Sequence, residues 1–264
     1  MPNPGKYAEL AERLAQLIES DYAPGDQFLT NSEIARRYGV SANTASRSVQ
    51  ALKEAGRLSG KVGGKTWVRV VPTHHQRSNE MYHQEKLRVR LPEAERRTWG
   101  VSEDSTRTSI DHVGEDSVEF AVIAPPSDIA ELMGLASGQK VLRRSYRRRN
   151  RPHEGASTSV SYLPYDLASR NPEILDPTNE PWPGGTQHAL CTVGIEVDRI
   201  EDRVTGEMPT DREVEEQDIP PGVPILRVRK ILYDTSDRVV GVADIPFAAD
   251  RVELRYLTRL ERWT

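Results

Sequence analysis

In the first sixty residues, apolar positions recur every three or four residues, which predicts amphipathic α-helices. The first helix should end near Ser20, because Pro24-Gly25 cannot continue it. Its apolar face is Tyr7, Leu10, Leu14, Leu17 and Ile18. A second, short helix should start at Thr30 or Asn31, either of which can cap it, with Glu33 in its first turn. The inner face of this helix is Ile34, Ala35 and Tyr38.

A third helix should follow at once, since Gly39 supplies a turn and Ser41 and Thr44 suit a helix start. Its inner face is Ala45, Val49 and Leu52, and Gly56 suits its end. Two short helices joined by a Gly-containing turn form the helix-turn-helix pattern. The next residues predict a wing, with strands at 58–61 and 65–70 and a tight turn at Gly63-Gly64. Trp67, Val68 and Val70 should pin this hairpin to the helices.

Charge indicates what this small domain contacts. The chain has a net charge of -4, yet residues 34–72 carry eight basic side chains and one acidic one. A basic segment on an acidic chain favours a polyanion-binding face, because clustered Lys and Arg displace counterions from phosphates. An ordinary solvated surface is the alternative.

The N-terminal stretch resembles the DNA-binding domain of the GntR family of bacterial regulators. The resemblance is carried by Pro24-Gly25, residues 32–35, residues 38–41, Asn43-Thr44 and residues 63–68. The sequence departs from the family pattern at Leu29, Asn31, Ala42 and Ser46. These departures predict an operator sequence outside the family's common pattern.

This resemblance implies that the third helix enters the major groove of operator DNA with its first residues nearest the base edges. Asn43 suits adenine, and Arg47 suits guanine or phosphate. Ser41 and Thr44 suit phosphate oxygens, with simple capping an equal alternative for Ser41. The expected DNA-binding residues are Ser32, Arg36, Ser41, Asn43, Thr44, Arg47, Lys61 and Lys65, the two lysines flanking the wing tip.

Beyond the wing, residues 72–79 are polar and begin with a proline, which suits a linker. We therefore expect a winged helix-turn-helix domain at 1–71, a linker at 72–79 and a second domain at 80–264. The adjacent His74 and His75 point to opposite sides of an extended chain, so they predict no metal site.

The second domain contains an internal repeat. The first copy runs from residues 127–130 through 141–143 and a turn at 150–152 to 161–164. The second copy runs from residues 211–214 through 225–227 and a turn at 234–237 to 243–246. Each copy predicts a helix, a strand, a hairpin and a second strand. Two copies side by side predict an α+β domain with one mostly antiparallel sheet.

This half resembles the UTRA effector-binding domain of the HutC subfamily of GntR regulators, which is similar in fold to chorismate lyase. The resemblance is carried by residues 135–144, 161–164, 208–210, 220–226 and 249–251. It implies a domain that binds a small metabolite, often an anion, in a cleft of its sheet. The expected effector-binding residues are Arg147, Ser159, Ser161, Asp244 and Phe247. Arginine offers a fork for carboxylate or phosphate, and Ser and Asp supply orienting hydrogen bonds.

Spacing alone does not decide which of the six arginines between 143 and 151 faces a ligand. Two departures from the family pattern predict a changed effector. Gly241 stands where the family often has a carboxylate, and Glu207 stands where it often has an arginine.

The sequence therefore predicts a cytoplasmic, homodimeric transcription repressor that binds double-stranded operator DNA under the control of a small-molecule effector. No apolar run is long enough to cross a membrane, and Cys191 is the single cysteine. We expect no cofactor and no enzyme activity, because no nucleophile–base–orienter set is recognisable. A constitutive, plasmid-type repressor with a degenerate effector site is the alternative, and a lyase-like enzyme is a less favoured one.

Overall fold

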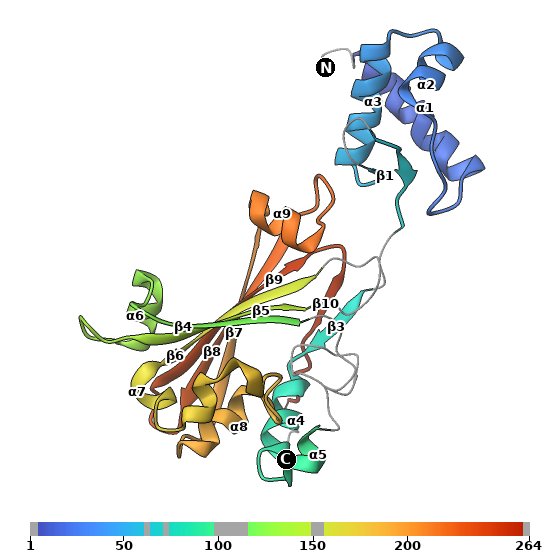
Figure 1. The fold of residues 1–264 in the computed structure, drawn as a ribbon. Coiled ribbons are helices and arrows are strands. Elements are labelled where there is room, and N and C mark those ends of the chain that lie inside the picture. Colours follow the sequence, from blue (N-terminus) through green and yellow to red (C-terminus); the bar gives the residue numbers. More distant parts are fainter. Residues whose placement is uncertain (1–4, 61–63, 71–73, 98–115, 149–155, 261–264) are drawn as a thin grey trace. The chain divides into compact units, whose positions relative to one another are not determined.

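The structure is a computed structural model of the 264-residue chain, and it describes residues 5–60, 64–70, 74–97, 116–148 and 156–260. The chain divides into two compact units (Figure 1). The first comprises residues 1–73 with 219–224, and the second comprises residues 74–218 with 225–264.

The first unit has the predicted winged-helix order. Helices α1 (Lys6–Asp21), α2 (Asn31–Tyr38) and α3 (Ala42–Glu54) precede an antiparallel hairpin of β1 (Leu58–Ser59) and β2 (Trp67–Val68). The apolar faces predicted for the three helices supply most of the core, which is completed by Phe28, Leu58 and Val68. The helix-turn-helix prediction is thereby confirmed.

The wing differs from the prediction in detail. Its strands are two residues long, and the expected tip residues 61–63 lie outside the described residues. Of the three residues expected to pin the hairpin, only Val68 is buried, while Trp67 and Val70 are exposed. Successive residues of a strand point to opposite faces, which turns Trp67 away from Val68, and Val70 lies beyond the end of the strand.

Local hydrogen bonds fix the starts of α2 and α3. The Thr30 side chain accepts from the Glu33 N–H, and the Glu33 carboxylate accepts from the Thr30 N–H, so α2 begins with a capping box. Thr30, not Asn31, is thus the cap. Ser41 caps α3 by accepting from the Thr44 N–H at 3.1 Å. Between the two helices, Gly39 adopts a left-handed conformation with φ of 64°.

The second unit is built on a six-stranded antiparallel sheet. Its order is β4 (Asp116–Ile123), β5 (Val141–Arg148), β6 (Ser157–Pro164), β9 (Val239–Ala248), β8 (Ile225–Asp234) and β7 (Val197–Glu207). The predicted repeat is present, because α6 (Ser127–Met133) precedes β5 and β6, and α9 (Asp211–Gln217) precedes β8 and β9. The two halves meet where β6 pairs with β9.

The sequence pattern missed the strand that leads each copy. β4 and β7 are the edges of the sheet, and they make each half a three-stranded unit around one helix. Charged side chains occur along the whole of β7, and they include Arg199, Glu201 and Arg203. Such charges are common on the exposed edge strands of sheets. This pattern conceals the apolar alternation that identifies a strand.

Further elements cover the sheet. After β6 come α7 (Tyr165–Ala168), two 3-10 turns, η2 (Pro172–Leu175) and η3 (Pro177–Asn179), and α8 (Gly185–Thr192). Before β4, α4 (Glu80–Arg88) packs on α8 and is followed by α5 (Glu93–Arg97). None of the described helices is long and apolar enough to span a membrane.

Part of the segment expected as a linker is a strand. β3 (His75–Ser78) pairs in parallel with β10 (Val252–Arg255). The backbone hydrogen bonds of this pair order four residues whose polar composition suggested irregular structure.

Alternation along the strands gives the sheet two faces. On one face, which we call the α8 face, lie Arg144, Tyr146, Arg148, Ser159, Ser161 and Lys230. On the other, which we call the α9 face, lie Arg143, Ser145, Arg147, Thr158 and Asp244.

Candidate functional site

The residues expected to contact DNA gather on α2 and α3. Ser32, Arg36, Ser41, Asn43 and Arg47 are exposed, and Thr44 is half-buried. Lys65 is exposed next to the Trp67 ring, with Nζ 6.0 Å from its centroid, whereas Lys61 lies outside the described residues. Apart from Lys61, the expected set is therefore present on the solvent-facing side of the helix-turn-helix or beside the wing.

Helix α1 positions the recognition helix through contacts that the sequence did not reveal. Ser48 is buried and donates to the Tyr7 carbonyl at 2.7 Å. The guanidinium carbon of Arg47 lies 4.2 Å from the centroid of the Tyr7 ring. A cation–π contact of this kind restricts the Arg47 side chain and orients it on the exposed face of α3.

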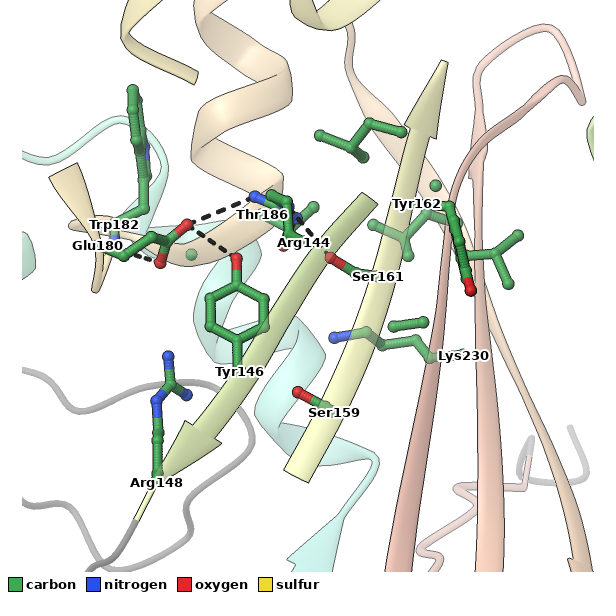
Figure 2. Close-up of a pocket in the computed structure, with 16 residues that line it drawn as sticks. Arg144, Tyr146, Arg148, Ser159, Ser161, Tyr162, Glu180, Trp182, Thr186 and Lys230 are labelled. Atoms are coloured by element: carbon green, nitrogen blue, oxygen red, sulfur yellow. Dashed lines mark hydrogen bonds and ion pairs between the residues drawn. The ribbon is translucent and has the colours of Figure 1, made fainter. Parts of the chain in front are cut away.

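A small cavity of about 40 Å³ opens on the α8 face of the sheet (Figure 2). Three of its cationic side chains are almost fully buried: Arg144 is 2% exposed, Lys230 4% and Arg148 9%. Glu180 is the one carboxylate among the residues that line the cavity. Three cationic side chains and one carboxylate line this cavity, and a cleft lined mainly by one sign of charge favours a ligand of the opposite sign.

Arg144 is held by the protein itself. Its Nε donates to Ser161 Oγ at 3.0 Å, its Nη2 donates to Thr186 Oγ1 at 3.1 Å, and its Nη1 lies 3.6 Å from Glu180 Oε1. Glu180 also accepts from the Tyr146 hydroxyl at 2.9 Å and from the Trp182 N–H at 3.0 Å (Figure 2). These groups form a fixed polar wall of the cavity.

Burial raises the pKa of the Tyr146 phenol far above its ordinary value, so this side chain stays a neutral hydrogen-bond donor. Arg148 lies beside it, with its guanidinium carbon 5.1 Å from the ring centroid. Lys230 reaches the same space from β8, and Ser159 reaches it from β6 (Figure 2). Arg148, Lys230 and Ser159 thus all line this cavity.

The five residues expected to bind an effector do not form one site. Ser159 and Ser161 line the cavity on the α8 face, and Ser159 also lines the cavity on the α9 face together with Arg147 and Asp244. Arg147 and Asp244 lie on the α9 face, where both carboxylate oxygens of Asp244 accept from Arg229 at 2.7 and 2.9 Å. Phe247 lines neither cavity. The centroid of its ring lies 5.7 Å from the guanidinium carbon of Arg77.

Sequence reasoning missed Arg144, Tyr146, Arg148, Glu180 and Lys230. The available signal was the hairpin register, since the pairing of Arg144 with Ser161 places the even-numbered residues of β5 beside the two serines. Without the hairpin length, the two faces of β5 were indistinguishable, because both carry arginines.

Both departures from the family pattern have defined positions. Gly241 lines the α8-face cavity, and a Cβ added there would lie 3.2 Å from Leu163 Cδ2. A carboxylate side chain at 241 would therefore require Leu163 to shift. Glu207 lies on β7 in an ion pair with Arg227 and lines neither cavity. The described residues contain no group of three or more side chains placed to hold a metal ion.

Comparison with known proteins identifies residues 111–253 as a UTRA domain. A solved structure described as a GntR-family transcriptional regulator is 20% identical, with a TM-score of 0.62, over 97% of this chain and 98% of that one. This likeness confirms the α+β fold over nearly the whole chain. No curated protein matches.

Two further solved structures are also similar. PhnF from Mycobacterium smegmatis is 15% identical over 96% of this chain and all of that one (100%), with a TM-score of 0.48. The ligand-binding domain of a GntR-type regulator from Bordetella bronchiseptica is 20% identical over 55% of this chain and 92% of that one, with a TM-score of 0.47.

Proposed function

The chain belongs to the UTRA-domain family, and from this membership we propose that it is a DNA-binding transcription regulator controlled by a small anionic effector. The observation that carries the proposal is the presence, in one chain, of an exposed recognition helix and a buried cationic cavity. The helix supplies operator binding, and the cavity supplies the signal.

In this proposal the cavity binds its ligand and does not convert it. The lining residues include no histidine or cysteine, and Ser161 is occupied by Arg144. The raised pKa of Tyr146 opposes formation of a phenolate nucleophile. Within the described residues no hydrogen bond joins Ser159 or Ser161 to a base that could activate it, which supports a sensor.

Arg148 and Lys230 anchor the anionic group of the effector, and Ser159 orients it by a hydrogen bond. Arg144 shapes the wall, since its three nitrogens already face Ser161, Thr186 and Glu180. The effector is therefore a small organic anion.

We infer that Lys230 couples effector binding in the cavity to the segment that joins the two units. Lys230 Nζ lies 5.9 Å from the centroid of the Tyr82 ring on α4. The Tyr82 hydroxyl donates to Asp202 at 2.8 Å and accepts from Arg77 on β3 at 2.5 Å. β3 is the first strand after residue 73, where the first unit ends. An anion that attracts Lys230 would move it away from the Tyr82 ring. The contacts of Tyr82 with Arg77 on β3 would then change, and the equilibrium between two positions of β3 would shift.

We assign the regulator to the HutC subfamily and expect it to act as a repressor that the effector releases from DNA. Helix-turn-helix regulators bind two half-sites about one helical turn apart, so the functional form is a homodimer on a near-palindromic operator. Its site of action is the chromosome, in the cytoplasm.

Genome-wide mapping of bound DNA would provide the operator, and anionic metabolites suggested by the neighbouring genes would then be tested for release of a fluorescent operator. We expect at least one to raise the apparent Kd for DNA. Lys230→Met should keep operator binding and lose the response, while exposed Lys140→Met should keep both. Turnover of the metabolite would overturn the proposal, and a response in no member of a broad library would favour a constitutive repressor.

A further inference from the structure

A second cavity lies on the α9 face of the sheet, directly behind the first. It is lined by residues of β4, β5, β6, β8, β9 and α9, and it is larger than the cavity on the α8 face. Arg143, Ser145 and Arg147 project into it from β5, while Arg144 and Arg148 of the same strand line the opposite cavity. One strand therefore presents arginines to two separate cavities.

Most charges of this second cavity are already paired. Arg227 pairs with Glu213, Arg212 pairs with Glu216, and Asp244 pairs with Arg229. The remaining carboxylate, Glu119, raises the pKa of Arg212 together with Glu216. None of these three pairs involves Arg143 or Arg147.

Arg143 and Arg147 differ from the paired arginines of this cavity in their hydrogen bonding. The Nε atom of each is buried and has no hydrogen-bond partner. Neither arginine forms an ion pair within the described part of the chain. Buried N–H donors are rarely left unsatisfied in folded proteins, because each costs about 1–3 kcal/mol when it lacks an acceptor. Both side chains are half-buried and line the cavity, so a ligand that enters it lies beside their guanidinium groups.

The strand register gives the spacing of the two arginines. They are four residues apart, so their Cα atoms are separated by roughly 13 Å at 3.3 Å per residue, and Ser145 lies between them. Ser117 and Thr158 pair with Arg147 on the two neighbouring strands. The surface is therefore cationic at both ends and lined by hydroxyl groups beside one end and at the middle.

We propose that the α9-face cavity is a second binding site, for a small organic dianion with two separated anionic groups and hydroxyl groups between them. Arg143 binds one anionic group and Arg147 the other, each through its guanidinium group. Ser145 and Thr158 hydrogen-bond the middle of the ligand and the end near Arg147. Tyr146, Ser159 and Tyr162 line both cavities, but no cationic side chain does, so the anion-binding groups of the two sites are distinct.

The test follows the arginine Nε–H signals of the ¹⁵N-labelled full-length protein by NMR, with citrate, succinate and acetate as probes at constant ionic strength. Arg143→Gln and Arg147→Gln assign the two signals. We expect citrate and succinate to shift both signals at concentrations at least tenfold below those that acetate requires. Arg147→Gln should weaken the response of the Arg143 signal at least tenfold.

Two further variants separate this site from its surroundings. Lys230→Met removes an anchor of the α8-face cavity and should leave the citrate response of both signals unchanged. Arg212→Gln removes a paired arginine from the α9-face cavity itself and should also leave the citrate response unchanged. Equal responses to acetate and citrate, or loss of the response in Lys230→Met, would overturn the proposal. So would signals that change with protein concentration alone, since a second copy would then cover this face.

Discussion

The two units of the chain use charged residues in opposite ways. In the winged-helix unit the core is apolar, and the basic residues expected at DNA lie on the surface. Lys53 is the exception, and its buried ammonium donates to the Gly60 carbonyl. In the sheet unit, by contrast, Arg77, Arg144, Arg148 and Lys230 are all buried. A unit that binds a large polyanion places cations outside, whereas a unit that encloses a small ligand places them inside.

This difference has a cost in stability. A buried charge network is stable only when its hydrogen bonds are complete, and removal of one member leaves the others without partners. The sheet unit should therefore be most sensitive to loss of a buried charge, and the winged-helix unit to loss of apolar volume.

The largest effect should come from Arg144→Ala, which leaves Glu180 buried without its cation. We expect a loss of about 3–5 kcal/mol in the free energy of unfolding of the sheet unit, measured by urea denaturation. Arg199→Ala removes a half-exposed arginine that pairs with Asp237, and it should cause no measurable loss. Similar losses in the two variants would contradict the contrast between buried and exposed pairs.

Leu14→Ala should destabilise the winged-helix unit by about 2–5 kcal/mol, because Leu14 is fully buried between the helices and leaves a cavity. Differential scanning calorimetry should show one lowered transition and one unchanged. Leu87→Ala, at an exposed leucine of the other unit, is the control. A uniform shift of both transitions would show that the two units unfold together.

Arg47→Ala should weaken operator binding by about 1–3 kcal/mol and spare random DNA if the side chain contacts a base. Equal losses on the two DNAs would assign Arg47 to a phosphate. Arg13→Ala is a matched control, because Arg13 also lies over a tyrosine ring, that of Tyr38, but belongs to α1. The measurement is fluorescence anisotropy at fixed salt.

A capping box occurs in each unit, which allows the same change to be compared in both. Thr30→Ala and Thr210→Ala each remove a hydroxyl that accepts a backbone N–H, and each should cost about 1 kcal/mol. Calorimetry should show the first loss in the winged-helix transition and the second in the sheet transition. A much larger loss for Thr210→Ala would mean that the Glu213–Arg227 pair depends on this cap.

The capping box formed by Thr30 and Glu33 also predicts how the stability of the winged-helix unit depends on pH. Hydrogen bonds from the Thr30 N–H and hydroxyl lower the pKa of Glu33. A carboxyl whose pKa is lowered on folding stabilises the native state above its ordinary value of 4.5, and the contribution is lost as the pH falls through the folded pKa. Thr30→Ala should therefore reduce the loss of stability between neutral and acidic pH.

The winged helix could be predicted from the sequence because its signals are local. Apolar spacing identified Leu10, Leu14 and Ile18, and polar residues at Thr30 and Ser41 marked two helix starts. The repeat was likewise visible, since both copies follow the same order of helix, strand and hairpin. These patterns depend on neighbours in sequence, where physical preferences are simple.

The binding face could not be predicted in the same way. Arg144 is buried because Thr186 and Glu180, about forty residues away, satisfy its guanidinium. Arg147 looked equivalent in sequence, but strand alternation places it on the other face with Asp244. Hydropathy assigns both arginines to solvent, and only the tertiary contacts distinguish them.

The two copies of the repeat build the sheet and place both of their helices, α6 and α9, on one side of it. The other side is closed mainly by residues 165–196, the segment between the copies, which supplies Glu180, Trp182 and Thr186 to the cavity. The repeat strands therefore supply both the architecture and the cationic side chains Arg148 and Lys230, while the segment between the copies supplies the opposite wall of the cavity. Evolution can rewrite the covering segment while the duplicated scaffold stays constant, and a protein engineer can graft a new one to change what the sensor detects.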